Sequence, residues 1–178
     1  MAENSRSSKV PSYVFAALTA AWLCFIFSNS LKSAADSSED SGRLLLFFQK
    51  MFPGMTEHVL RKLAHFAEFA ILGIFASLAV LFWLGRTYLA PLLRRTASGN
   101  APISLRRRII PAVALASILG FLAPVVDELL QLLSPGRSTE FLDMLIDFGG
   151  YVFGFALTAA IFLLILRRRL SKYSDKAV

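Results

Sequence analysis

Four long apolar stretches divide the chain, and most of its polar residues lie between them or at their ends. The stretches cover residues 11–28, 63–84, 109–133 and 141–166. A helix needs about 20 mainly apolar residues to cross roughly 30 Å of hydrocarbon, and each stretch is close to that length. The pattern predicts an all-α polytopic membrane protein, a single domain over residues 1–178 whose four transmembrane helices form a bundle.

A shorter apolar segment lies between the first two predicted spans. Residues 43–52 read RLLLFFQKMF, and Pro53 and Gly54 follow. Ten residues are too few to cross the bilayer, which favours a short outer helix that lies in the membrane interface or re-enters it. A helix that caps the bundle is the alternative.

The composition agrees with a membrane protein and argues against a nucleic-acid partner. Hydrophobic residues make up 56% of the chain, more than a soluble domain needs. The 19 Lys and Arg against 12 Asp and Glu give a basic chain, but the basic residues form short runs beside the apolar stretches. They lack the aromatic interleaving of a nucleic-acid surface, so we expect the lipid bilayer to be the main partner.

The distribution of basic residues predicts how the chain is oriented. Four spans place both termini on one side of the membrane. That side holds thirteen of the 19 basic residues, which are Arg6, Lys9, Arg86, Arg94, Arg95, Arg106, Arg107, Arg108, Arg167, Arg168, Arg169, Lys172 and Lys176. The positive-inside rule then predicts a multi-pass plasma (inner) membrane protein with cytoplasmic N- and C-termini.

A cleaved signal peptide is a competing interpretation of the first stretch. Arg6 and Lys9 precede the apolar run, and residues 33–35 (SAA) resemble a small-residue cleavage site. The apolar run is long for a signal peptide and the candidate site is late, which favours an uncleaved span.

Ionisable and polar residues gather at the outer ends of the predicted helices, whereas the cytoplasmic halves are apolar. The group comprises Ser28, Asn29, Ser30, Arg61, Lys62, His65, Glu68, Asp127, Glu128, Gln131, Arg137, Glu140, Asp143 and Asp147. This asymmetry predicts an outward-facing polar site at the depth of the lipid headgroups.

Helical spacing places members of this group on common faces. Arg61, His65 and Glu68 follow i, i+4, i+7 spacing, and Asp127 and Gln131 follow i, i+4 spacing. One face of the fourth predicted helix holds Glu140, Asp143, Asp147, Gly150 and Gly154. Small residues allow membrane helices to approach closely, so we expect the glycines to pack against another helix and the acids to face inward.

The helix macrodipole leads to a specific pairing hypothesis. Arg61 and Lys62 lie at the predicted N-terminus of the second span, and Asp127 and Glu128 lie near the predicted C-terminus of the third. Both placements are unfavourable for the helix dipole. Intramembrane charges usually pair, so we expect either cation to pair with either of these acids.

The acids of the fourth span differ in whether the start of a helix accounts for their negative charge. Glu140 and Asp143 follow Ser138 and Thr139, a possible N-cap, in a first turn where negative charge is favourable. Glu140 is therefore interpreted as an ordinary N-terminal acid.

Asp147 lies deeper in the same span. A carboxylate near the bilayer boundary costs a few kcal/mol unless it is paired or hydrated. Candidate partners are Arg137, Lys62 and His65.

The motifs that hold these residues resemble those of the VanZ-like family, which is named for a teicoplanin-resistance factor. The matching pieces are FSNS at 27–30, RKLAHFAEFAILG at 61–73, DELLQLLSPGRS at 127–138 and DMLIDFGG at 143–150. The resemblance implies a four-helix bundle whose characteristic positions hold nine of the polar residues, namely Lys62, His65, Glu68, Asp127, Glu128, Gln131, Arg137, Asp143 and Asp147. Two departures are Phe69, where the family commonly has tyrosine, and Phe148, where it commonly has a smaller side chain.

Binding is the function that the polar site favours first. We expect it to hold an amphipathic ligand, such as a lipid-linked cell-wall intermediate or a lipoglycopeptide, with cations meeting anionic groups. The candidate ligand-binding residues are Lys62, Gln131, Arg137, Asp143, Asp147, Ser28 and Asn29.

Two alternatives remain open at this stage, and whether the protein is an enzyme is undecided. A membrane hydrolase or transferase would use acid–base chemistry from His65, Glu68, Asp127 and Glu128. A structural or regulatory partner would use the charges only to lock the bundle. No cofactor and no metal are expected. A metal-dependent version of the enzyme would use His65, Glu68, Asp127 and Asp147, but a single histidine with scattered carboxylates lacks a zinc-site spacing and would suit a harder cation that prefers oxygen ligands.

Overall fold

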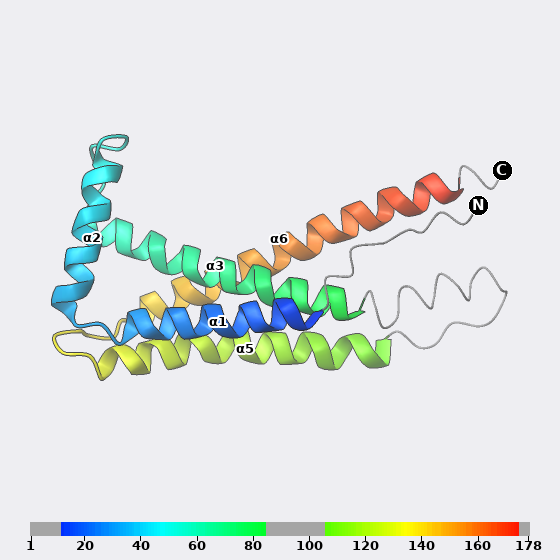
Figure 1. Cartoon of the computed structure of the whole chain (residues 1–178), viewed down its shortest axis with the longest axis horizontal. Helices are drawn as coiled ribbons and strands as arrows, with labels where there is room; N and C mark the ends of the chain where they lie inside the picture. The colour runs from blue at the N-terminus through cyan, green and yellow to red at the C-terminus, as the bar shows by residue number, and fades with distance from the viewer. Residues whose placement is uncertain (1–11, 85–105, 175–178) are drawn as a thin grey trace.

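In the described part of the chain, four long apolar helices run along the molecule, and one further helix lies across one end of them (Figure 1). The computed structural model describes residues 12–84 and 106–174. Its helices are α1 (Ser12–Ser30), α2 (Ala34–Gln49), α3 (Glu57–Leu84), α5 (Arg106–Leu132) and α6 (Phe141–Ser174). All except α2 contain a segment long and apolar enough to cross a membrane, which confirms the predicted all-α, four-span architecture.

The second span begins earlier than its apolar residues suggested. Thr56 Oγ1 accepts a hydrogen bond from the backbone N–H of Val59 at 3.3 Å, and α3 starts at Glu57 instead of at residue 63. A capped helix continues through charged residues because its backbone hydrogen bonds do not depend on side-chain polarity. Arg61 and Lys62 therefore lie in the second turn, away from the N-terminal amides.

The helix between the first two spans is longer than the predicted segment 43–52 and begins earlier. α2 starts after Ser33, whose hydroxyl accepts a hydrogen bond from the backbone N–H of Asp36 at 3.2 Å, and it ends at Gln49. Its apolar residues Leu46 and Phe47 are 69% and 60% exposed. An exposed apolar surface that crosses the end of the spans fits a helix in the membrane interface (Figure 1).

Several predicted basic positions lie outside the described residues. These are Arg6, Lys9, Lys176 and the part of the basic loop that covers residues 85–105.

The main helix contact of the bundle joins α3 and α6, which pack together more extensively than any other described pair. A Cβ atom added at Gly150 would meet the backbone of Phe66, and one added at Gly154 would meet the backbone of Ala70. The predicted packing of these glycines against another helix is confirmed. The buried core beside this crossing consists of Ile26, Phe69, Leu72, Ala76, Ala123 and Tyr151.

The crossing predicts which glycines of α6 tolerate a side chain. We expect Gly150→Ala and Gly154→Ala each to lower the free energy of unfolding by roughly 1–3 kcal/mol, because the added methyl meets backbone atoms of α3. Unfolding in mild detergent, followed by tryptophan fluorescence, measures the change.

Gly149→Ala is the matched control, since a Cβ at Gly149 meets nothing within 4 Å. It should leave stability equal or slightly raised, because alanine is the better helix former. Equal losses at all three positions would contradict the close crossing.

Candidate functional site

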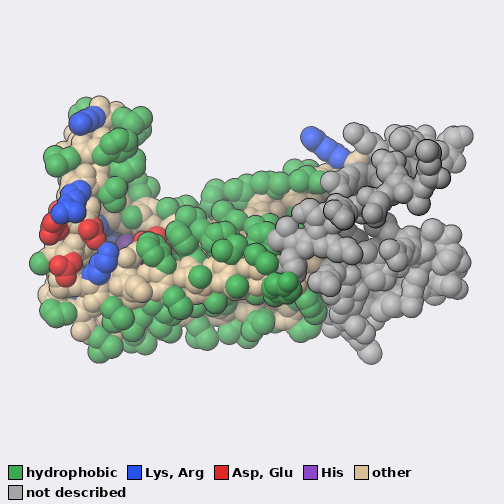
Figure 2. Space-filling view, in the orientation of Figure 1, with side chains coloured by type: hydrophobic (Ala, Val, Ile, Leu, Met, Phe, Trp, Pro, Cys, Tyr) green, Lys and Arg blue, Asp and Glu red, His purple; other side chains and the backbone are tan. Residues whose placement is uncertain are grey.

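Most of the charged side chains visible in Figure 2 lie at the end of the bundle that α2 crosses (Figures 1 and 2). We call this region the polar end. Buried polar residues there are Ser30, Asp127, Glu128, Gln131, Ser134, Asp143 and Asp147. The predicted convergence of polar residues from separate helices is therefore seen in the structure.

Asp127 is held by hydrogen bonds on both carboxylate oxygens. The hydroxyl of Ser30 donates to Oδ1, and Nε2 of Gln131 donates to Oδ2 at 2.8 Å. Asp127 and Gln131 share a face of α5 as their spacing predicted. Ser30 belonged to the predicted polar group but not to the candidate ligand-binding or catalytic residues, because its contact with Asp127 depends on how α1 packs against α5.

Lys62 pairs with acids of the α6 end and not with the acids of α5. Its Nζ contacts Asp143 Oδ1 and lies 3.3 Å from Oε2 of Glu140. The expected pairing of Lys62 or Arg61 with Asp127 or Glu128 is wrong. The earlier start of α3 moves both cations off the helix terminus, and the tight α3–α6 crossing brings Asp143 next to Lys62.

Glu128 contacts the start of α6. Its Oε2 accepts a hydrogen bond from the backbone N–H of Glu140 at 3.3 Å, while its Oε1 is buried without a partner. α6 begins at Phe141, so Ser138 and Thr139 precede its first turn and do not cap it as expected. Glu140 is half exposed and takes part in the Lys62 interaction, which makes it more than an ordinary N-terminal acid.

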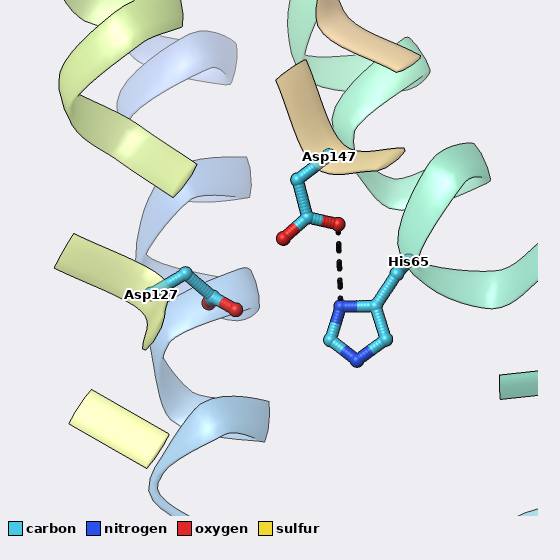
Figure 3. A group of neighbouring side chains, drawn as sticks. All are labelled: His65, Asp127 and Asp147. Carbon is cyan, nitrogen blue, oxygen red and sulfur yellow. Dashed lines mark ion pairs between the residues drawn. The ribbon is translucent and has the colours of Figure 1, made fainter. Parts of the chain in front are cut away.

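Asp147 and His65 face each other across the α3–α6 crossing (Figure 3). His65 Nδ1 and Asp147 Oδ1 are 3.4 Å apart, within ion-pair distance, yet neither atom has a hydrogen-bond partner of acceptable geometry. Asp147 is completely buried. Of the three candidate partners for Asp147, His65 is the one within ion-pair distance.

Glu68 is held from α1, and one predicted residue of α1 does not join the site. Nδ2 of Asn29 donates to Glu68 Oε1 at 3.1 Å, and the indole of Trp22 donates to the Glu68 carbonyl at 2.8 Å. Ser28 is exposed and its hydroxyl donates to the Cys24 carbonyl of its own helix at 2.7 Å. The hydrogen bond from Trp22 to Glu68 was not predicted, since the sequence position of Trp22 gives no information about the neighbouring helix.

Two arginines lie together without a carboxylate partner among the described residues. Arg137 donates only to the backbone carbonyls of Asn29 and Ser30, at 3.4 and 3.3 Å. Nε of Arg61 is buried and has no hydrogen-bond partner. Burial, with the nearby positive charge of Arg61, lowers the pKa of Arg137, although a guanidinium stays charged at neutral pH.

A cavity of about 510 Å³ opens beside these arginines, between α1, α2 and α3. Its polar lining includes Arg61, Arg137, His65 and Glu68, and its apolar lining includes Phe25, Leu44 and Ala64. At its rim Lys32 and Asp40 form an exposed ion pair at 2.8 Å, and this lysine lowers the pKa of Asp40. The cavity thus combines free positive charge with an apolar wall.

Comparison with protein families gives one match. A family model described as VanZ/LLP1 matches residues 15–165, which is most of the chain. Comparisons with curated proteins and with solved structures give no match. The matched range contains every residue of the site just described.

The buried ion pair predicts a measurable coupling between α3 and α6. A double-mutant cycle of Lys62→Gln and Asp143→Asn should give a coupling energy of about 1–3 kcal/mol, because both side chains are largely buried. Unfolding in mild detergent measures all four corners of the cycle.

The same cycle on Lys32→Gln and Asp40→Asn provides the exposed control. Those side chains are 43% and 54% exposed, so solvent screening should leave little coupling. A coupling for Lys62 and Asp143 no larger than this control would contradict the assigned pairing.

Proposed function

The chain belongs to the VanZ/LLP1 family, and from that premise we propose that it binds an amphipathic ligand with an anionic headgroup at the outer face of the plasma membrane. A lipid-linked cell-wall intermediate or a lipoglycopeptide has this chemistry. Binding such a molecule would give the protein a role at the cell envelope, including the tolerance of teicoplanin-like glycopeptides for which the family is named.

The pair of arginines is the observation that carries this proposal. Arg61 and Arg137 lie on one cavity without an acidic partner among the described residues, whereas Lys62 is already paired with Asp143. Two guanidiniums that repel each other gain most from an anion placed between them. Arginine is well suited to phosphate and carboxylate groups because its planar fork can donate two parallel hydrogen bonds.

The apolar wall of the cavity supports an amphipathic ligand over a free anion. Phe25 on α1 and Leu44 on α2 line it, and the cavity lies where the spans meet the crosswise helix α2. A headgroup bound there would sit at interfacial depth, and its chain could follow the exposed apolar surfaces of the spans into the bilayer.

The orientation of the protein in the membrane is part of the same proposal. The basic residues on the side of the termini, including those of the loop after the second span, outnumber those at the polar end, so the polar end should face outward.

Labelling of a single cysteine tests this orientation. In a Cys24→Ser background, Ser38→Cys on exposed α2 should react with a membrane-impermeant maleimide on intact cells.

A cysteine appended after Val178 is the control for orientation. It should react only after the membrane is permeabilised, because the C-terminus is expected to be cytoplasmic. The reverse labelling pattern would contradict the proposed topology.

Ligand binding is tested with fluorescent polyprenyl phosphate and the matching neutral polyprenol, titrated into purified protein. We expect the phosphate to bind at least about tenfold more tightly than the alcohol, since charge-assisted hydrogen bonds contribute about 1.5–3 kcal/mol. The Arg61→Gln, Arg137→Gln variant should lose this preference while keeping similar side-chain volume.

Lys50→Gln is the control for losing a positive charge away from the cavity, because Lys50 is exposed beyond the end of α2. It should bind both probes as the wild type does. Equal affinity for the phosphate in the double variant and the wild type would contradict the proposal.

A membrane enzyme is the second candidate, and the position of His65 favours it. His65 lines the cavity and lies 3.4 Å from Asp147, so an acid–base group adjoins the proposed headgroup position. Mass spectrometry of the lipid recovered from the binding assay distinguishes the two functions. Chemical conversion of the lipid by the wild type that is lost in His65→Gln would favour a hydrolase or transferase. Recovery of the lipid unchanged would favour binding.

A further inference from the structure

We propose that His65, Asp127 and Asp147 together hold a divalent metal cation next to the cavity. They come from α3, α5 and α6, and one ligand atom of each lies within 4.8 Å of the others. Figure 3 shows the three side chains pointing into one shared space. The sequence allows a metal group of His65, Glu68, Asp127 and Asp147 but predicts no metal, whereas the structure brings three of these four residues together.

The unpartnered state of Asp147 points to a ligand. Its carboxylate is fully buried, and neither oxygen has a hydrogen-bond partner in the part of the chain that the structure describes. Nδ1 of His65, on the opposite side of the shared space, also lacks one. Buried polar atoms nearly always have a partner. These three atoms without one therefore point to an electron-pair acceptor, such as a metal cation, bound near them.

Charge balance gives an independent reason for a cation. Asp127 and Asp147 are both fully buried, and the described residues form no ion pair between either of them and a lysine or arginine. Lys62 is paired with Asp143, and Arg137 donates to backbone carbonyls. Two neighbouring buried carboxylates repel each other strongly, and a divalent cation between them removes that repulsion.

The surroundings of Asp127 resemble the outer contacts of a metal ligand. Ser30 and Gln131 each donate to one of its oxygens, which fixes the orientation of the carboxylate. Such contacts orient metal ligands, and each carboxylate oxygen keeps a lone pair for a cation.

The ligand set suits a cation such as Mn²⁺, which accepts both carboxylate oxygen and imidazole nitrogen. At ligand distances of about 2.2 Å, donor atoms lie at most about 4.4 Å apart, so atoms that all lie within 4.8 Å of one another need to approach by at most roughly 0.4 Å. Three protein ligands leave positions for water or an anionic oxygen, and His65 also lines the cavity. The cation site does not depend on the lipid ligand proposed above.

Titration with Mn²⁺ alone tests the site on the full chain, purified in mild detergent and stripped with EDTA. Electron paramagnetic resonance counts the free ion, and we expect one Mn²⁺ to bind per chain. Pulsed measurements should detect one coupled nitrogen nucleus, which disappears in His65→Gln. Asp147→Asn should weaken binding by about tenfold or more.

Asp36→Asn is the control, because it removes an exposed carboxylate of α2 and should leave the affinity unchanged. Wild-type protein that binds no Mn²⁺, or binds it without nitrogen coupling, would overturn the proposal. A folded Asp147→Asn protein with wild-type affinity would also overturn it. If that variant is not recovered as a monodisperse protein, His65→Gln decides by the same comparison of affinities.

Discussion

Carboxylates that are withdrawn from water at the end of a lipid-embedded bundle need a compensating positive charge or a set of donors, and the polar end is organised around that need. Asp143 is compensated by Lys62, and Asp127 by donors from α1 and its own helix. Asp147 has neither kind of compensation among the described residues, where His65 is its one neighbour within ion-pair distance. Because leaving such a group unpaired costs several kcal/mol, the way each carboxylate is satisfied constrains how the four spans pack together.

The glycine crossing of α3 and α6 provides the rigid frame for these interactions. Gly150 packs against Phe66, the residue next to His65, and Asp147 lies one helical turn before Gly150. Close backbone contact at this point fixes the separation of His65 and Asp147 and brings Asp143 to Lys62 one turn further along. A wider crossing would separate both pairs at once, so the packing of small residues and the electrostatics of the site depend on each other.

The cations at the polar end divide into two functional kinds. Lys62 is committed to acids of α6 and stabilises the bundle, while Arg61 and Arg137 keep their charge available to the cavity. This division separates the structural charges from those that can meet a ligand. It also places the proposed anion site and the proposed cation site on neighbouring parts of one region, joined by His65.

The sequence by itself determined the four spans, the presence of a short helix between the first two of them and the set of polar residues at one end, because hydrophobic length and helical spacing are local properties. It also gave the i, i+4 contact of Asp127 with Gln131 and the inward-facing glycines of α6. Only the tertiary structure decided which charges pair. Lys62 meets Asp143, Ser30 holds Asp127 and Ser28 stays outside the site, since these outcomes depend on the crossing of α3 and α6 and on where each helix begins. The grouping of His65, Asp127 and Asp147 has the same origin, because contacts among three helices leave no periodic signal in the chain.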